Sequence, residues 1–142
     1  MGEAGGQPDH AYFDHDADVG VIGRGARPED ALVGAARAVF ALTTRIDEVQ
    51  PRERVAIDFE EEDLEYALVT WLNLLLARAQ ERRLALGRFA LAHDGKRWTG
   101  EAWGEPWRED LERGVDVKGA TLTMLSVKPV DGTWEARCVV DV

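Results

Sequence analysis

LALGRFALAHDGKRWTGEAW, residues 84–103, contains two strand-like runs that meet at a tight turn. Its central Asp94-Gly95 is typical of a short connection between antiparallel strands. A second such turn, Asp131-Gly132, precedes an alternating run that continues to the end of the chain. The preceding segment, 115–128, also alternates and is predicted to be a strand. A second half rich in hairpins favours an α+β fold with largely antiparallel pairing over a doubly wound α/β sheet.

Two amphipathic helices are predicted in the first half of the chain, with a half-buried strand, 52–59, between them. The first begins at Pro28, because proline presets φ and the following acidic residues favour the positive end of the helix dipole. The second begins with the acidic run 60–63. The apolar stripes at helical spacing are Leu32, Ala35, Ala36, Val39 and Phe40 in the first helix, and Leu64, Ala67, Leu68, Trp71, Leu72, Leu75 and Ala79 in the second. The expected architecture is a single compact domain with two main helices packed on a largely antiparallel or mixed sheet.

Composition points to a soluble, cytoplasmic protein. The net charge of −10 argues against strong direct nucleic-acid binding, which needs a concentrated basic face. The single cysteine, Cys138, excludes an internal disulfide and a cysteine-based zinc site, and its place on an apolar strand face predicts an inert core thiol. No apolar run reaches membrane-spanning length. We expect residues 1–10 to form a flexible tail and residues 11–142 to form the domain.

The run DHDAD, residues 14–18, places three carboxylates at a spacing of two residues beside a histidine. In an extended segment such side chains share one face, where their charges repel one another unless solvent or a cation separates them. Ca²⁺, Mg²⁺ and Mn²⁺ all favour oxygen ligands. A solvated acidic turn is the alternative.

The end of the chain carries a second pair of oxygen anions. The alternating pattern stops one residue after Asp141, so the α-carboxylate of Val142 lies next to the Asp141 side chain. If this end approaches Asp18, three carboxylates from opposite ends of the chain can bind Ca²⁺, Mn²⁺ or Mg²⁺. The alternative is an exposed aspartate paired with a basic side chain. Lys118 could supply that charge or contact an anionic partner, or it is a solvated strand lysine.

Three motifs together resemble the archease family: His15-x-Ala17-Asp18, VKGAT at residues 117–121, and CVVDV at residues 138–142. Further short segments, including the helix start at Pro28, follow one another in the same order as in the family. The resemblance therefore covers about residues 12–142. It implies an accessory protein of the RNA ligase that joins tRNA exon halves. Such a protein promotes guanylylation and multiple turnover of the ligase without being an enzyme itself. The resemblance also implies a divalent metal held by Asp18, Asp141 and the carboxylate of Val142.

The chain departs from the family pattern at three places. Asp16 stands where family members usually carry threonine, Leu122-Thr123 stands where many have Tyr-His, and segment 106–114 lacks a histidine often found there. Two other functions stay open: a metal-dependent hydrolase of a phosphorylated or nucleotide substrate, and a chaperone-like interaction module. Against the hydrolase, the sequence contains no recognisable general base with a supporting group.

Overall fold

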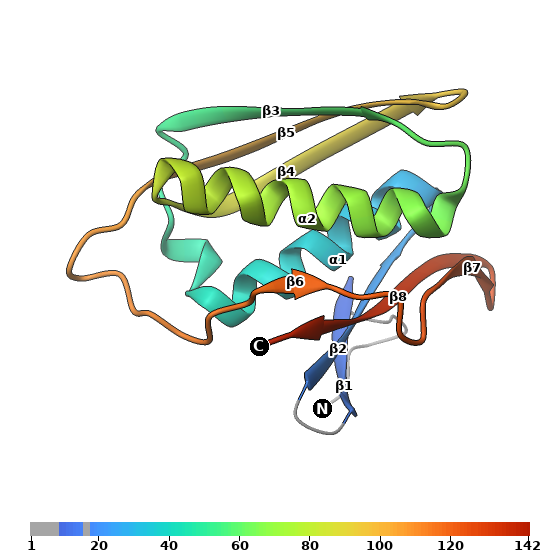
Figure 1. The fold of residues 1–142 in the computed structure, drawn as a ribbon, viewed down its shortest axis with the longest axis horizontal. Coiled ribbons are helices and arrows are strands. Elements are labelled where there is room, and N and C mark those ends of the chain that lie inside the picture. Colours follow the sequence, from blue (N-terminus) through green and yellow to red (C-terminus); the bar gives the residue numbers. More distant parts are fainter. Residues whose placement is uncertain (1–8, 16–17) are drawn as a thin grey trace.

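The computed structural model describes residues 9–15 and 18–142. The elements run along the chain in the order shown in Figure 1: β1 (His10–His15), β2 (Asp18–Gly25), α1 (Pro28–Thr43), η1 (Ile46–Glu48), β3 (Glu53–Glu60), α2 (Leu64–Arg82), β4 (Leu84–Asp94), β5 (Arg97–Pro106), β6 (Gly119–Ala120), β7 (Ser126–Val130) and β8 (Thr133–Asp141). Strand β1 begins at the last residue of the predicted tail 1–10, while residues 1–8 lie outside the described part.

The described strands form two antiparallel sheets. One has the order β3-β5-β4, with β4 and β5 joined by the predicted hairpin, whose turn residues are Gly95 and Lys96, one position later than predicted. In the other, β1, β2 and β8 lie side by side, and both β6 and β7 pair with the outer edge of β8. The turn between β7 and β8 has positive φ at both Asp131 and Gly132, as a two-residue hairpin turn requires. This arrangement confirms the α+β prediction.

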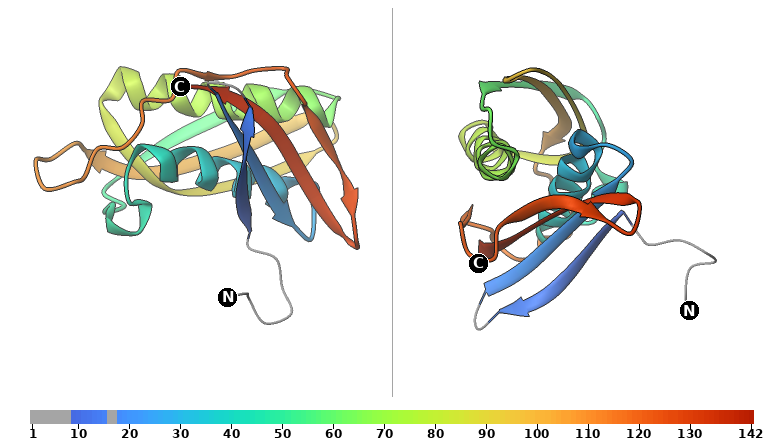
Figure 2. Two further views of the ribbon diagram at one scale, coloured as in Figure 1. Left: turned by 90° about the horizontal axis from the view of Figure 1, so that it is seen from below. Right: turned by 90° about the vertical axis from the view of Figure 1, so that its right-hand side faces the viewer.

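Helix α1 lies between the two sheets and contacts β2 and β8 on one side and β4 on the other (Figure 2). It approaches β2 closely because small residues meet at the contact. A Cβ atom at Gly23 would overlap the carbonyl oxygen of Ala31 and the backbone nitrogen of Ala35. Both alanines are fully buried. The small side chains of α1 therefore permit its close approach to β2.

Helix α2 packs against α1 and carries the predicted apolar stripe into the core. The indole nitrogen of Trp71 donates to the carbonyl oxygen of Leu32 at 3.0 Å, which joins the two helices in the buried interior. The helix begins later than predicted, at Leu64. Asp63 is its N-cap, and its carboxylate accepts hydrogen bonds from the backbone nitrogens of Glu65 and Tyr66. The acidic run therefore lies before the helix, because the Asp63 side chain satisfies backbone donors that have no partner within the helix.

The predicted strand 115–128 is wrong as one continuous element. Its central part leaves the edge of β8 between β6 and β7. The Thr121 hydroxyl donates to the carbonyl oxygen of Val139 and accepts from the backbone nitrogen of Thr123, and Met124 has a φ of 53°. Such local side-chain bonds compete with ladder pairing and form a turn.

No helix in the described part of the chain combines the length and apolarity needed to cross a membrane. Cys138 is fully buried on β8, where loss of hydration raises the pKa of its thiol to about 12. This confirms the predicted inert core thiol, because the reactive thiolate form is suppressed at neutral pH.

Candidate functional site

The pairing of β2 with β8 brings the two ends of the domain together. The ladder pairs Val19 with Val140, and the same register puts Asp18 opposite Asp141 at the next position. Figure 2 shows the end of β8 beside the start of β2. Two of the three predicted site residues therefore lie on neighbouring strands, although they are 123 positions apart in the sequence.

Directly opposed residues of an antiparallel pair project from the same face of the sheet, with Cβ atoms about 5 Å apart. The carboxylates of Asp18 and Asp141 are therefore neighbours, and like charges in this arrangement repel each other. Asp18 is half-buried, and Asp141 is exposed. Among the side chains that the structure describes, which do not include that of His15, neither carboxylate forms an ion pair with a basic group. This end of the sheet thus carries two carboxylates that are at least partly exposed and have no basic partner among the described side chains.

The third predicted donor, the α-carboxylate of Val142, follows Asp141 directly and belongs to a partly exposed residue. Within the described part of the chain, no three His, Cys, Asp or Glu side chains cluster closely enough to hold a metal. The described side chains at this end are therefore those of Asp18 and Asp141, and the α-carboxylate of Val142 stays the predicted third donor. All three donors are hard oxygen anions, which fits Ca²⁺, Mg²⁺ or Mn²⁺.

The acidic stretch near the N-terminus is described only in part. Strand β1 pairs His15 with Asp18, so the backbone of His15 lies beside the candidate site. Asp16 and the side chains of Asp14 and His15 lie outside the described residues.

Strand β6 borders the candidate site on the other side and is held from two directions. The backbone nitrogen of Lys118 donates to the carbonyl oxygen of Asp141 at 2.8 Å, and Gly119 pairs with Asp141 in the ladder. From α2, the Asn73 carboxamide accepts from the backbone nitrogen of Ala120 at 2.8 Å and donates to its carbonyl oxygen at 3.3 Å. Asn73 thus pairs with β6 as a neighbouring strand would.

Sequence reasoning missed the role of Asn73. The feature of the sequence that could have indicated this role is a single carboxamide in the run WLNLLL at residues 71–76, where every other side chain is apolar. Lys118, which the sequence singled out, contributes its backbone to the site. Its exposed ammonium forms no ion pair with a carboxylate among the described residues.

Comparisons with known proteins give one consistent family. A sequence model of the archease protein family matches residues 10–142. The archease of Sulfolobus acidocaldarius is 35% identical over 134 residues, covering 92% of this chain and 96% of that protein. The archease of Methanopyrus kandleri is 34% identical over 134 residues, covering 91% and 96%.

Two solved structures share the fold. The solution structure of a Methanobacterium thermoautotrophicum protein matches with a TM-score of 0.85 at 30% identity, covering 94% of this chain and 99% of that one. The crystal structure of an archease from Thermotoga maritima, described as a possible chaperone, matches with a TM-score of 0.64 at 17% identity, covering 99% and 100%. This second likeness concerns the fold alone. On the family match and the curated relatives, the chain belongs to the archease family.

Proposed function

We propose that this protein is a metal-binding accessory factor that activates the RNA ligase of tRNA splicing. It promotes guanylylation and multiple turnover of the ligase and does not join RNA itself. Membership of the archease family supports the broader part of this proposal, an accessory protein of the chaperone-like kind that acts through another protein. The metal-binding part of the proposal rests on one observation: the register of β2 and β8 puts Asp18 opposite Asp141, and neither carboxylate has a basic partner among the described side chains.

Asp18, Asp141 and the α-carboxylate of Val142 would hold the metal. A bound divalent cation would neutralise three negative charges and offer further coordination positions to water or to groups of a partner. The ladder of β2 with β8 ends at Val19 and Val140, directly beside Asp18 and Asp141, and β6 supports the end of β8, which favours a fixed spacing of these two donors. The site is thus a pre-formed part of the sheet, accessible at its end.

The charge of the chain supports a protein partner rather than RNA. It carries 27 acidic residues against 17 lysines and arginines. An acidic surface attracts a basic RNA-binding enzyme and repels the phosphates of free RNA. We therefore propose a cytoplasmic role in which the protein docks on the ligase, with no strong contact to nucleic acid.

The test combines the purified protein with the ligase, GTP and a divalent metal, and follows labelled guanylate bound to the ligase. We expect faster guanylylation and more than one round of ligation per ligase molecule. An unchanged rate would contradict the proposal. Nucleotide hydrolysis by this protein alone would favour the alternative of a metal-dependent hydrolase.

Extending the chain beyond Val142 tests the terminal donor. Adding Gly-Ser-Gly converts the α-carboxylate of Val142 into an uncharged amide carbonyl and moves the new carboxylate away. Because ligand charge strongly sets the affinity of an oxygen site for such cations, we expect metal affinity to fall at least about tenfold. Calorimetric titration with Mn²⁺ measures this. The same three residues added before Met1 are the control, and equal affinity in both extended proteins would exclude Val142 from the site.

A further inference from the structure

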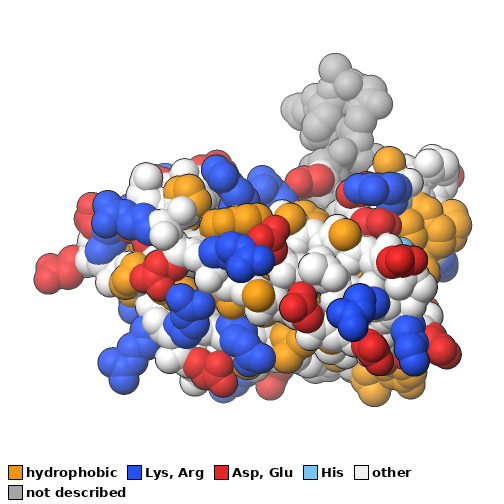
Figure 3. Space-filling model, turned by 90° about the horizontal axis from the view of Figure 1, so that it is seen from above, with side chains coloured by type: hydrophobic (Ala, Val, Ile, Leu, Met, Phe, Trp, Pro, Cys, Tyr) orange, Lys and Arg blue, Asp and Glu red, His pale blue; other side chains and the backbone are white. Residues whose placement is uncertain are grey.

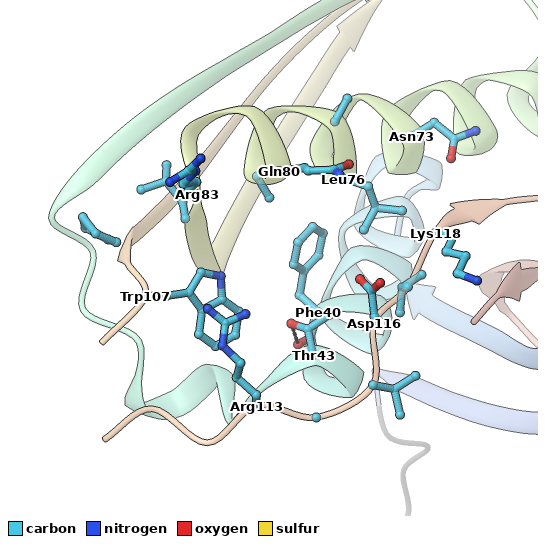
Figure 4. A pocket seen from close by; sticks show the side chains of 17 residues that line it. Phe40, Thr43, Asn73, Leu76, Gln80, Arg83, Trp107, Arg113, Asp116 and Lys118 are labelled. Atoms are coloured by element: carbon cyan, nitrogen blue, oxygen red, sulfur yellow. Dashed lines mark hydrogen bonds between the residues drawn. The ribbon is translucent and has the colours of Figure 1, made fainter. Parts of the chain in front are cut away.

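A pocket of about 930 Å³ opens between the C-terminal parts of α1 and α2 and the segment 106–118 (Figure 4). This volume is within the range of small-molecule sites. Phe40, Leu76 and Val117 supply apolar surface inside it. Neither Asp18 nor Asp141 lines the pocket, although Asn73 and Lys118, which lie beside the end of β8, do.

Two arginines define one end of the pocket. Arg83 and Arg113 lie on the same side of it in Figure 4, next to Trp107. Both are exposed, and neither forms an ion pair within the described residues, although nine other arginines there do. Of the five arginines without an ion pair among the described residues, these two line the pocket. Guanidinium groups bind phosphate through paired N–H donors.

The Arg113 side chain is supported by an aromatic ring. Its guanidinium carbon lies 4.0 Å from the centroid of the Trp107 ring, a cation–π arrangement. This contact uses the face of the guanidinium group and leaves its N–H donors in the plane available. A ligand anion therefore meets a donor group that is already oriented.

The ends of the two helices do not cancel this positive charge. Carbonyl groups at a helix C-terminus carry partial negative charge and would repel an anion. In α1, the backbone nitrogens of Gly114 and Val115 donate to the carbonyl oxygens of Thr43 and Leu42, each at 2.8 Å. At the end of α2, the backbone nitrogen of Arg83 donates to carbonyl groups of the last turn. These carbonyl groups are therefore already hydrogen-bonded within the protein.

The other side of the pocket is lined by Asp116 and Lys118, so it carries one exposed carboxylate and one exposed ammonium. Asp116 lies across Phe40 from Arg113 in Figure 4, and its exposed carboxylate forms no ion pair among the described side chains. A carboxylate without a basic partner can accept hydrogen bonds from a ligand. The pocket thus offers two guanidinium groups on one side, an apolar middle, and on the other side a carboxylate acceptor next to Lys118.

We propose that this pocket binds a mononucleotide. Its phosphate contacts Arg83 and Arg113, its base lies against Phe40 and Leu76, and Asp116 accepts a hydrogen bond from an amino group of the base. A mononucleotide combines these three features in one small molecule. This inference is independent of the proposed metal site and of ligase activation.

The binding test uses calorimetry with AMP in the presence of EDTA, so that no metal contributes. We expect saturable binding of one AMP per chain. Arg83→Asn should weaken it at least about tenfold, because a charge-assisted contact to phosphate is lost. Asparagine is chosen because Arg83 has a φ of 55°, a left-handed conformation that asparagine tolerates.

Arg88→Asn on β4 is the matched control. Arg88 is also exposed, has no ion pair among the described residues and does not line the pocket. Strand β4, which carries Arg88, belongs to the β3-β5-β4 sheet, and the outer surface over this sheet shows interspersed basic and acidic side chains (Figure 3). AMP affinity should be unchanged in this variant, as it should be in Asp141→Asn, which separates this inference from the metal site.

A second comparison tests the base end. Purine riboside monophosphate, which lacks the amino group of AMP, should bind the native protein more weakly than AMP. In Asp116→Ala this preference should disappear, because no side-chain acceptor remains for the amino group. The proposal is overturned by absence of AMP binding at millimolar concentration, by equal loss of affinity in Arg83→Asn and Arg88→Asn, or by inorganic phosphate binding as tightly as AMP.

Discussion

Asp141→Asn is expected to abolish divalent-metal binding and the stimulation of the ligase, while the protein remains folded. The substitution removes one of three negative donors from a site in which charge provides most of the attraction. It preserves the backbone carbonyl that accepts from the Lys118 nitrogen, and the side chain is exposed, so no core contact is lost. Asp18→Asn should have the same effect, because the register of β2 and β8, extended by one position, puts Asp18 opposite Asp141.

Without metal, each of these variants should be as stable as the native protein or slightly more stable. Removal of one charge relieves the repulsion between opposed carboxylates, which is worth a few tenths of a kcal/mol to about 1 kcal/mol. Calorimetric titration with Ca²⁺, Mn²⁺ and Mg²⁺, together with thermal unfolding in EDTA, measures both effects. Asp58→Asn on β3, another exposed strand aspartate, is the control. Native metal affinity in both site variants would count decisively against this site.

Gly23→Ala is expected to lower the free energy of unfolding by at least about 3 kcal/mol, a large share of the stability of a domain this size. The added methyl group would overlap the carbonyl oxygen of Ala31 and the backbone nitrogen of Ala35. These are backbone atoms of α1, so the clash is relieved only if the whole helix moves away from β2. Such a movement would also disturb the packing of α1 on β8 and β4.

The control for this prediction is Gly119→Ala on β6. A Cβ atom there meets only the Asn73 side-chain oxygen, at 3.4 Å, so stability should change little. Urea unfolding followed by tryptophan fluorescence gives both free energies. If the two variants were equally stable, α1 would not pack on β2 as closely as the structure describes.

The elements that follow local rules were predictable. Both helices and both hairpin turns appear near their expected positions, because spacing at 3.6 residues and turn residues such as Asp131-Gly132 act over a few positions. Two boundaries were wrong for equally local reasons. The Asp63 side chain caps α2 later than the acidic run indicates, and Thr121 turns the chain out of the predicted strand 115–128.

The candidate site depends on information of a different kind. Sequence patterns and family resemblance select Asp18, Asp141 and Val142, but alternation within a strand does not reveal which strand lies beside it. Asp18 meets Asp141 because β2 and β8 pair in one particular register, and a shift of one residue would put the two carboxylates on opposite faces. That register is a property of the packed sheet and of α1 beneath it.

The roles of Asn73 and of the pocket arginines have the same origin. Asn73 binds Ala120, 47 positions away, and Arg83 and Arg113 lie 30 positions apart at the end of α2 and in the loop after β5. No local periodicity links such pairs. The chain specifies its helices, strands and acidic residues through local chemistry. Long-range packing alone sets which of these groups become neighbours, because the free energy of burying the core is gained only when distant segments meet.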